Sequence, residues 1–181
     1  NRLQVKIFEP GASLLTVILA NVDTVGDPYG STIPHHLERV VTVTASMCQE
    51  ALAAGQSVGM ITNGKSLLYE RPMSVPAARN HQQLSLIFEA LAMVTSFGGS
   101  RMEEELVTAA RRLPQGTTMV LITAVVTQEL LLALELLLGE GRSPLVLWVA
   151  DWEPEGLPVG IIWRNLAPYL VSLEREYGIA A

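Results

Sequence analysis

The run Ser13-Leu-Leu-Thr-Val-Ile-Leu-Ala20 leads directly into Asn21-Val-Asp-Thr-Val25, and these two stretches together indicate the fold class. The first is almost continuously apolar, which is typical of a strand covered by helices on both faces of a sheet. In open α/β sheets, ligands bind beyond the carboxyl ends of such strands. A hard cation at that place needs several oxygen ligands, usually including carboxylates. Only Asn21, Asp23 and Thr24 offer polar side chains here, so we expect the position of a ligand site but few of its ligands.

Strands and helices alternate along the rest of the chain. Besides the apolar run, the expected strands are Leu3–Phe8, Gln56–Thr62, Ser66–Glu70, Thr117–Val125, Leu145–Ala150 and Pro158–Trp163. The expected helices begin at Ser31–His35, Asn80–Gln83, Ser100–Glu103, Thr127 and Pro168. This alternation predicts an α/β fold, a three-layer, doubly wound and mostly parallel sheet with one antiparallel edge strand. The place of the first strand in the sheet stays open.

The antiparallel edge strand is expected from the dipeptide Asn63-Gly64, which is a strong signal for a tight hairpin turn. The same residues belong to Gly59-Met-Ile-Thr-Asn-Gly-Lys-Ser66, which matches the pattern of a phosphate-binding loop. Such a loop needs a strand before its first glycine, free backbone N–H groups, and a helix after its last residue. Here the first half of the match belongs to an expected strand, and the segment that follows is too short for a helix. We therefore interpret the match as coincidental.

Composition and charge limit the classes of partner. The chain has 181 residues, most simply one domain over residues 1–181, with 49% hydrophobic residues and a mean hydropathy of +0.33. Its apolar runs are too short or too interrupted to cross a bilayer. The formal net charge is −6 and no stripe of Lys or Arg occurs, which argues against nucleic acid and anionic membranes as partners. The single cysteine, Cys48, excludes an internal disulfide, fits a reducing compartment and is expected to be a buried, inert thiol.

Other chemically suggestive residues have ordinary structural explanations. The adjacent residues His35-His36 are expected to point apart on a helix, whereas metal ligands on one helix face need a spacing of three or four. His81 lies on a different element, so we expect solvated histidines at a helix start and no metal site. Glu103-Glu-Glu105 occupies an expected first helical turn, where the helix dipole favours negative charge. We recognise no nucleophile motif such as G-x-S-x-G and no paired acid and base, which argues against an enzyme.

The order of these elements, together with several short motifs, resembles a known family. The motifs are Leu3-Gln-Val-Lys-Ile-Phe-Glu-Pro10, Leu37-Glu-Arg through Ala45-Ser46, Ala54-Gly-Gln-Ser-Val-Gly59, Asn63-Gly64 and Leu113-Pro-Gln-Gly-Thr-Thr-Met-Val-Leu-Ile-Thr123. In this order, over nearly the whole chain, they resemble the von Willebrand factor A-like domain of a bacterial family of unknown function. Members of that family are associated with MoxR-type AAA+ ATPases. The resemblance implies a von Willebrand A-like fold, upstream membrane-spanning helices, and a location on the cytoplasmic face of the membrane for the full-length protein.

The resemblance also implies that the site at the top of the sheet lacks several ligands of a divalent cation. In von Willebrand A domains, a divalent cation is held by Asp-x-Ser-x-Ser after the first core strand, by a Thr from a later loop and by an Asp after the fourth core strand. Here Asn21 stands at the Asp, Asp23 at the first Ser and Val25, which cannot ligate, at the second. The segment Ala124-Val-Val-Thr127 carries no carboxylate. The residues expected at this degenerate ion-dependent adhesion site, with no bound metal and no cofactor, are Asn21, Asp23, Thr24, Asp27, Thr95, Ser96 and Thr123.

Three functional hypotheses remain open at the level of the sequence. The first is a non-enzymatic protein-interaction module that acts with a MoxR-type ATPase through the loops at the top of the sheet. The second is an Mg²⁺-dependent adhesion-type module that uses Asp23 and Asp27 to hold the cation. The third is a nucleotide-binding enzyme that uses Gly59–Ser66. The lost ligands favour the first hypothesis, and we expect this segment to stay out of the membrane.

Overall fold

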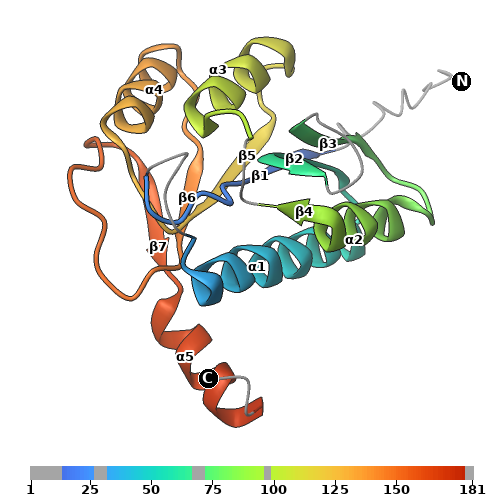
Figure 1. Cartoon of the computed structure of the whole chain (residues 1–181). Coiled ribbons are helices and arrows are strands. Elements are labelled where there is room, and N and C mark those ends of the chain that lie inside the picture. Colours follow the sequence, from blue (N-terminus) through green and yellow to red (C-terminus); the bar gives the residue numbers. More distant parts are fainter. Residues whose placement is uncertain (1–13, 27–31, 67–71, 96–98, 178–181) are drawn as a thin grey trace, which may run out of the picture.

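A mixed β-sheet is the framework of the molecule (Figure 1). The computed structural model describes residues 14–26, 32–66, 72–95 and 99–177. The strands in these ranges are β1 (Leu15–Ala20), β2 (Ser57–Ser66), β3 (Pro72–Ala78), β4 (Val94–Thr95), β5 (Thr118–Thr123), β6 (Leu145–Trp148) and β7 (Ile162–Asn165). The helices are α1 (Pro34–Ala53), α2 (Gln83–Met93), α3 (Met102–Arg112), α4 (Gln128–Gly139) and α5 (Ala167–Tyr177).

β1 lies inside the sheet, parallel to β2 on one side and to β5 on the other. The strand order is β3-β2-β1-β5-β6-β7, and β4 also pairs with β2. β3 and β4 run antiparallel to β2, whereas β6 runs parallel to both β5 and β7. The predicted fold class, a doubly wound and mostly parallel sheet with an antiparallel edge, is therefore confirmed.

The chain builds outward from β1 to β3, returns beside β1 as β5 and continues to β7. The strand order thus reverses between β1 and β5, which is where sheets of this kind bind ligands. The last strand is observed as β7, later than the expected Pro158–Trp163. The expected strand Leu3–Phe8 lies outside the described residues.

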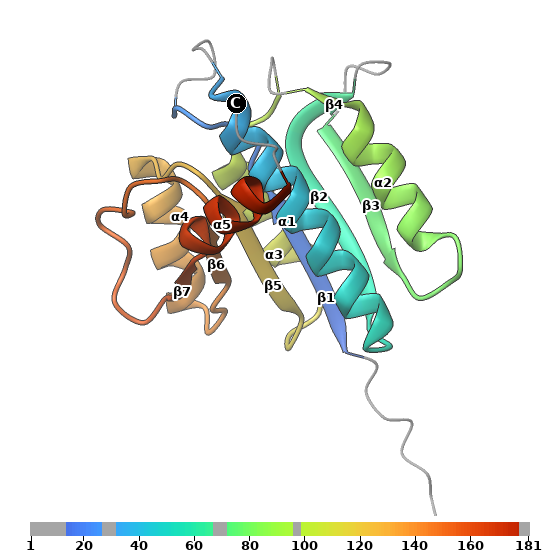
Figure 2. The ribbon, with the colours of Figure 1, turned by 90° about the horizontal axis from the view of Figure 1, so that it is seen from below.

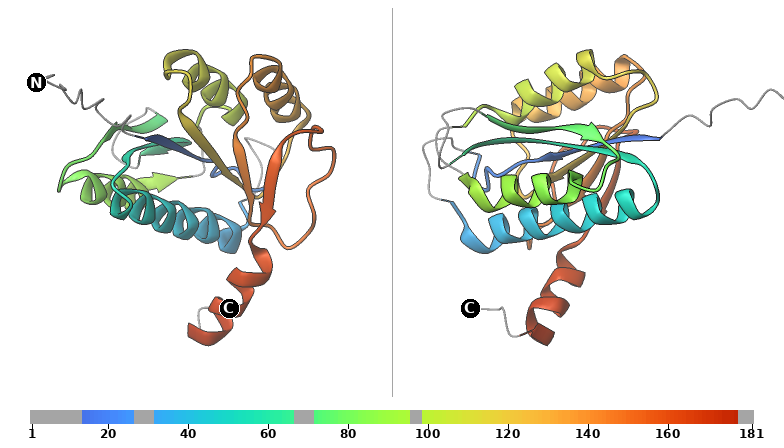
Figure 3. Two further views of the ribbon diagram at one scale, coloured as in Figure 1. Left: turned by 180° about the vertical axis from the view of Figure 1, so that it is seen from behind. Right: turned by 90° about the vertical axis from the view of Figure 1, so that its right-hand side faces the viewer.

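Helices cover both faces of the sheet (Figure 3). α1 and α2 pack on one face and α3 and α4 on the other, which gives three layers. Along β1, Ile18 packs into the core on the α1 side and Leu19 into the core on the α4 side, and both are fully buried. Because successive side chains of a strand point to opposite faces, a strand buried on both faces has no polar side. This explains why the sequence of β1 is almost entirely apolar.

α5 packs beside α1, outside the sheet layers (Figure 2). Leu170 of α5 enters the core on the α1 side, and Glu174 of α5 forms an ion pair with Arg39 of α1. The backbone N–H of Leu166 donates to the carbonyl of Trp148 at 2.8 Å, which connects the start of α5 to β6. Among the helices of the described residues, none is long and apolar enough to span a membrane.

The predicted hairpin at Asn63-Gly64 is wrong, because β2 runs without a break through both residues. Gly64 is not among the glycines with positive φ, whereas the expected two-residue turn requires positive φ. A Cβ at Gly64 would lie 2.5 Å from the carbonyl oxygen of Thr95, so the glycine lets β4 approach β2 closely. The antiparallel partners of β2 are β3 and β4, and most of the expected strand Ser66–Glu70 lies outside the described residues.

The predicted helix starts are confirmed in part. α1 begins at Pro34, and Thr127 caps α4 by accepting a hydrogen bond from the backbone N–H of Leu130. Asn80–Gln83 and Ser100–Glu103 match the pattern of a capping box, but α2 begins at Gln83 and α3 at Met102 without a side-chain cap, so this pattern is not realised. At the start of α2, Gln83 is buried and its amide donates to backbone carbonyls, one of them that of Pro76. This glutamine therefore holds α2 against the neighbouring strands instead of capping the helix.

Candidate functional site

Three buried polar side chains meet at the carboxyl ends of β1, β2 and β5, a place that we call the sheet-top site. Asn21 follows β1, Asn63 lies near the end of β2, and Thr123 is the last residue of β5. The parallel registers of β1 with β2 and with β5 bring these positions side by side. The sheet-top site therefore coincides with the reversal of strand order, where the fold class predicts a ligand.

Asn21 is the centre of a hydrogen-bond network that uses both ends of its side-chain amide. Its Oδ1 accepts from Nδ2 of Asn63 at 2.9 Å and from the backbone N–H of Asp23 at 3.2 Å. Its Nδ2 donates to Oγ1 of Thr123 at 3.0 Å. Asn63 is itself oriented, because its Oδ1 accepts from the backbone N–H of Val22 at 2.9 Å. The site demands a donor and an acceptor from residue 21 together, which an amide provides and an ionised carboxylate does not.

The network ends on the loop after β5. Oγ1 of Thr123 donates to the carbonyl of Val125 at 2.6 Å and accepts from the backbone N–H of Val125 at 3.2 Å. Ala124, the first residue after β5, is buried and offers no side-chain ligand. The three polar side chains at the strand ends are thus neutral and bonded to one another or to the backbone. They supply no charge that would attract a cation.

Asp23 and Thr24 stabilise the loop between β1 and α1. Oδ1 of Asp23 accepts from the backbone N–H groups of Val25 and Gly26, each at 3.0 Å. Oγ1 of the buried Thr24 accepts from the backbone N–H of Ile33 at 2.8 Å. Asp and Thr commonly form such bonds in turns. One oxygen of the Asp23 carboxylate is therefore already engaged with the backbone.

The structure brings together only some of the predicted site residues. Asp27 and Ser96 lie outside the described residues. Thr95 belongs to β4, where its Oγ1 donates to the carbonyl of Lys65 at 3.3 Å. Asn63 was not predicted as a site residue, because Asn-Gly is a turn signal. Its position directly after the expected end of a strand beside β1 was the signal that could have revealed it.

A small pocket with a volume of about 140 Å³ opens beside this network. The two asparagines of the network form part of its wall, and the charged residues that line it are Asp23, Arg101, Glu103 and Glu129. Nη1 of Arg101 lies 3.7 Å from Oε1 of Glu103. Three carboxylates against one guanidinium make the rim acidic, which favours a basic group on a partner.

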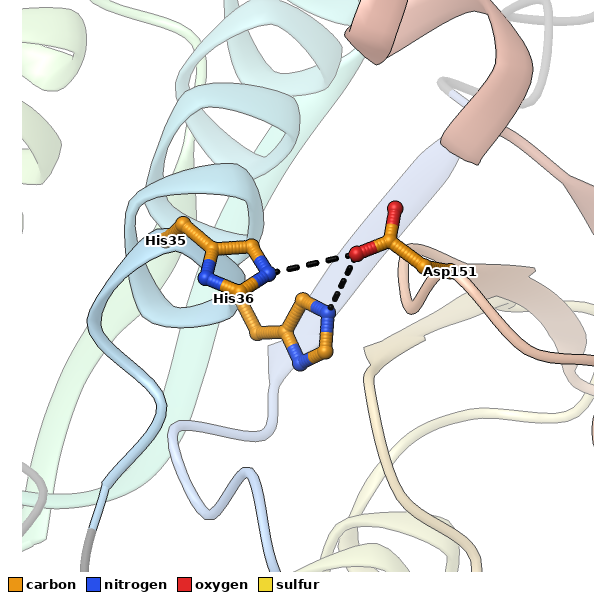
Figure 4. Close-up of side chains that lie close together, drawn as sticks. All are labelled: His35, His36 and Asp151. Carbon is orange, nitrogen blue, oxygen red and sulfur yellow. Dashed lines mark hydrogen bonds and ion pairs between the residues drawn. The ribbon is translucent and has the colours of Figure 1, made fainter. Parts of the chain in front are cut away.

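A second cluster of polar side chains lies where α1 begins (Figure 4). Nε2 of His35 and Nε2 of His36 both lie 3.2 Å from Oδ2 of Asp151, which follows β6. The expectation of solvated histidines holds for His35, which is exposed, and is wrong for His36, which is 1% exposed and packs edge-on against Trp152 with ring centroids 4.9 Å apart. Burial lowers the pKa of His36 below 6.5, although the hydrogen bond that Asp151 accepts from this ring acts in the opposite direction. The two rings converge on a carboxylate distant in sequence, which helix spacing alone cannot reveal.

Arg39 holds Asp151 in place from the next turn of α1. Its Nη1 donates to Oδ1 of Asp151 at 2.7 Å and to the carbonyl of Val149 at 3.1 Å. Its Nε and Nη2 donate to the two carboxylate oxygens of Glu174 at 2.6 and 2.9 Å. Burial opposes the charge of Asp151, but hydrogen bonds from Arg39 and the two histidines outweigh it and lower the pKa of Asp151 to about 2. The hydrogen bond from Arg39 also lowers the pKa of Glu174, so both carboxylates are ionised at neutral pH.

Two further features singled out in the sequence have structural roles. Gly59–Ser66 lies entirely within β2, whose backbone pairs with β1 and β3, so this stretch does not form a phosphate-binding loop. Cys48 is buried in α1, and burial raises the pKa of its thiol to about 12. The thiol is therefore protonated and unreactive at neutral pH.

Similarity to known proteins is confined to solved structures. No protein-family model and no curated protein matches the sequence. The chain is similar to the pilus adhesin SpaC from Lactobacillus rhamnosus GG in its open conformation, with a TM-score of 0.56 and 12% identity, covering 92% of this chain and 30% of the adhesin. It is also similar to proximal thread matrix protein 1 from the mussel byssus, with a TM-score of 0.54 and 7% identity, covering 91% of this chain and 46% of that protein.

An aerotolerance-related membrane protein from Bacteroides fragilis gives a TM-score of 0.49 and 11% identity, covering 92% of this chain and 100% of that one. The chain spans less than half the length of the adhesin and of the byssus protein. At these identities, the two stronger likenesses show the fold alone. The architecture is von Willebrand A-like, a mostly parallel sheet with one antiparallel edge between two layers of helices.

Proposed function

We propose that this chain is a non-enzymatic protein-interaction module whose sheet-top site recognises a partner without a metal ion. The observation that carries the proposal is the hydrogen-bond network of Asn21, Asn63 and Thr123 at the reversal of strand order. In the fold that the chain resembles, this position holds a divalent cation, whereas here the polar atoms bond to one another. Because the same fold serves many functions, the argument rests on the site and not on the architecture.

The carboxylates around the sheet-top pocket are too dispersed to share a cation. Mg²⁺ dehydrates reluctantly and needs charged ligands close together. Among the described residues, Asp23, Glu103 and Glu129 do not form a group whose donor atoms are near enough to one another to hold an ion. One oxygen of Asp23 is bonded to the backbone, and Glu103 pairs with Arg101. These contacts support recognition through hydrogen bonds and surface charge.

The size and lining of the pocket support a binding surface over an enzyme active site. Small-molecule pockets usually occupy about 300–1,000 Å³, whereas this pocket has about 140 Å³. The described residues that line it include no His, Cys or Lys, and the side chains able to accept a proton are the carboxylates of Asp23, Glu103 and Glu129. Among its polar wall residues, Asn21, Asn63 and Asp23 are hydrogen-bonded within the fold.

A MoxR-type AAA+ ATPase is the partner that the sequence resemblance suggests. The chain carries a net charge of −6 and the rim of the pocket is acidic, so a complementary ATPase surface would be basic. Attraction of this kind acts mainly on the association rate and weakens as salt rises. We therefore expect a complex that forms without a divalent cation at the sheet-top site and that weakens at high ionic strength.

The test is the affinity of the full-length protein for a MoxR-type ATPase of the same organism. Glu129 lies in the first turn of α4, at the pocket, and Glu140 lies at the opposite end of the same helix. Glu129→Arg should weaken binding by at least about tenfold through charge repulsion, and the control Glu140→Arg should bind as the wild type does. Thermal melting of both variants establishes that each is folded.

Three results would count against the proposal. Failure of the wild-type protein to bind the ATPase would remove the partner assignment. Equal affinity of Glu129→Arg and Glu140→Arg would show that the sheet-top site is not the surface used. With nucleotide-free ATPase a chelator acts on this chain alone, so binding that is lost in chelator and restored by Mg²⁺ would favour the adhesion-type module that uses Asp23 and Asp27.

A further inference from the structure

Away from the sheet-top site, the cluster of His35, His36 and Asp151 has the composition of a transition-metal site (Figure 4). Two imidazole nitrogens and one carboxylate oxygen form a common ligand set for Zn²⁺, and they also suit Co²⁺, Ni²⁺ and Cu²⁺. Hard cations such as Mg²⁺ and Ca²⁺ prefer oxygen ligands alone. We propose that these three residues bind a divalent transition-metal ion, with Zn²⁺ as the preferred species.

The spacing of the donor atoms fits such an ion. Each histidine Nε2 lies 3.2 Å from Oδ2 of Asp151, and the three donor atoms lie within 4.8 Å of one another. Ligands that are about 2.0–2.2 Å from a tetrahedral ion are about 3.3–3.5 Å from each other. The two distances from histidine to Asp151 therefore need to lengthen by only about 0.1–0.3 Å to admit the ion. The separation between the two histidine nitrogens is bounded only by 4.8 Å, and a rotation of the exposed His35 ring would bring it toward the same range.

The ligands are held by well-anchored parts of the fold. His35 and His36 belong to the first turn of α1, which has 20 residues, and Asp151 follows shortly after β6. Arg39 holds Oδ1 of Asp151 and is itself held by Glu174, so Oδ2 stays directed at the histidines. Hydrogen bonds that orient a ligand in this way increase metal affinity. The site thus resembles one that is formed before the ion arrives.

Binding of the ion replaces the hydrogen bonds between the histidines and Asp151. Each Nε2 then carries the metal, and the neutral ring carries its proton on Nδ1. Nδ1 of His36 is buried and has no hydrogen-bond partner among the described residues, so this change of tautomer breaks no bond at that atom. The side chain of His35 is 55% exposed, so water can accept from its Nδ1.

The cluster leaves a coordination position open to solvent. His36 is buried, whereas the side chains of His35 and Asp151 are 55% and 46% exposed. Water therefore completes a tetrahedral ion from that side. Asp151 and Glu174 together outweigh the single charge of Arg39, so the cluster attracts a cation.

Zn²⁺ alone is the probe, added to the chelator-treated full chain without a polyhistidine tag. Calorimetric titration should show one bound Zn²⁺ per chain, and Co²⁺ should give the intense visible absorption of a tetrahedral complex. His35→Gln changes an exposed side chain and should weaken Zn²⁺ binding by at least about tenfold. The matched control is His81→Gln, an exposed histidine outside the cluster, which should bind Zn²⁺ as the wild type does.

Absence of saturable Zn²⁺ binding below millimolar concentrations would mean that the three side chains are only hydrogen-bonded, and the proposal would fail. Equal affinity of His35→Gln and wild type would also overturn it, because the ion would then lie elsewhere. The result is independent of the sheet-top proposal, because Glu129→Arg leaves all three ligands in place. That variant should keep its Zn²⁺ affinity even where it loses the protein partner.

Discussion

Position 21 holds an asparagine, and its side-chain amide is fixed by the structure. Asn21 has an amide nitrogen where an aspartate has an oxygen, and that nitrogen donates to Thr123 in a buried network. Buried polar atoms are costly when unpaired, so the network is stable only while each donor keeps its acceptor. Through this network, the side chain of Asn21 joins Asn63 and Thr123 and so connects β1, β2 and β5.

The variant Asn21→Asp tests this role of the amide. The carboxylate cannot donate to Thr123 and places a charge in a buried, neutral network, so we expect the free energy of unfolding to fall by about 1–3 kcal/mol. Urea unfolding of wild type and variant, each with and without Mg²⁺, measures the difference. A variant that Mg²⁺ makes more stable than the wild type would reveal a latent cation site and contradict this account.

At the scale of the element, β2 shows how tertiary contacts decide the conformation of a dipeptide. Asn63-Gly64 favours a turn when judged locally, yet Oδ1 of Asn63 accepts from Val22 and Gly64 lies against β4. Both contacts require an extended β2 beside β1 and β4. Local preference is weak compared with several buried hydrogen bonds, so the strand continues through the turn signal.

Gly64→Ala should destabilise the chain because the added Cβ would lie 2.5 Å from the carbonyl oxygen of Thr95 and 2.6 Å from Cγ2 of Val94. The expected loss of unfolding free energy is about 1–3 kcal/mol, and hydrogen exchange should increase in β4. Gly139→Ala is the control, because no atom lies within 4 Å of its added Cβ and the residue ends a helix. Wild-type stability in Gly64→Ala would show that β4 does not pack as described.

The ion pair between Arg39 and Glu174 should stabilise the docking of α5 in a pH-dependent way. Because the hydrogen bond from Arg39 lowers the pKa of Glu174 below 4.5, the contribution is fully present above that pH and is lost as pH falls below it. Glu174→Gln should lower the free energy of unfolding at pH 7 by about 1–2 kcal/mol. Urea unfolding at pH 7 and in acid should show a difference from wild type that shrinks in acid. The control is Glu176→Gln, an exposed residue of the same helix, and a difference independent of pH would exclude the ion pair as its cause.

At the scale of the whole molecule, the sequence predicts what local pattern controls. The apolar run of β1 and the alternation of strands with helices are enough for the layers and the mostly parallel sheet. The prediction of a hairpin turn at Asn63-Gly64 was wrong because β4 packs against Gly64, and this contact joins residues that are distant in sequence. Such contacts depend on the register of the strands and on which strands are neighbours. Neither can be predicted from a short stretch of sequence alone.

The candidate sites follow the same division. Asn21, Asp23 and Thr123 were predictable because each lies where a buried strand ends, and the ends of parallel strands meet at one edge. Asn63 was not predicted as a site residue because the dipeptide Asn63-Gly64 was interpreted as a turn. The convergence of His36 on Asp151 joins residues 115 positions apart, so no spacing within a helix could indicate it.

The central claim is that the polar side chains of the sheet-top site bond to one another and bind no cation. The most direct test compares the melting temperature in chelator with that in millimolar Mg²⁺. A ligand that binds only the folded chain raises the melting temperature. We predict the same melting temperature in both conditions for the wild type. Asp23→Ala should lose about 1 kcal/mol of stability equally in both, because Asp23 bonds the backbone of Val25 and Gly26. A rise with Mg²⁺ in the wild type that disappears in Asp23→Ala would contradict the account.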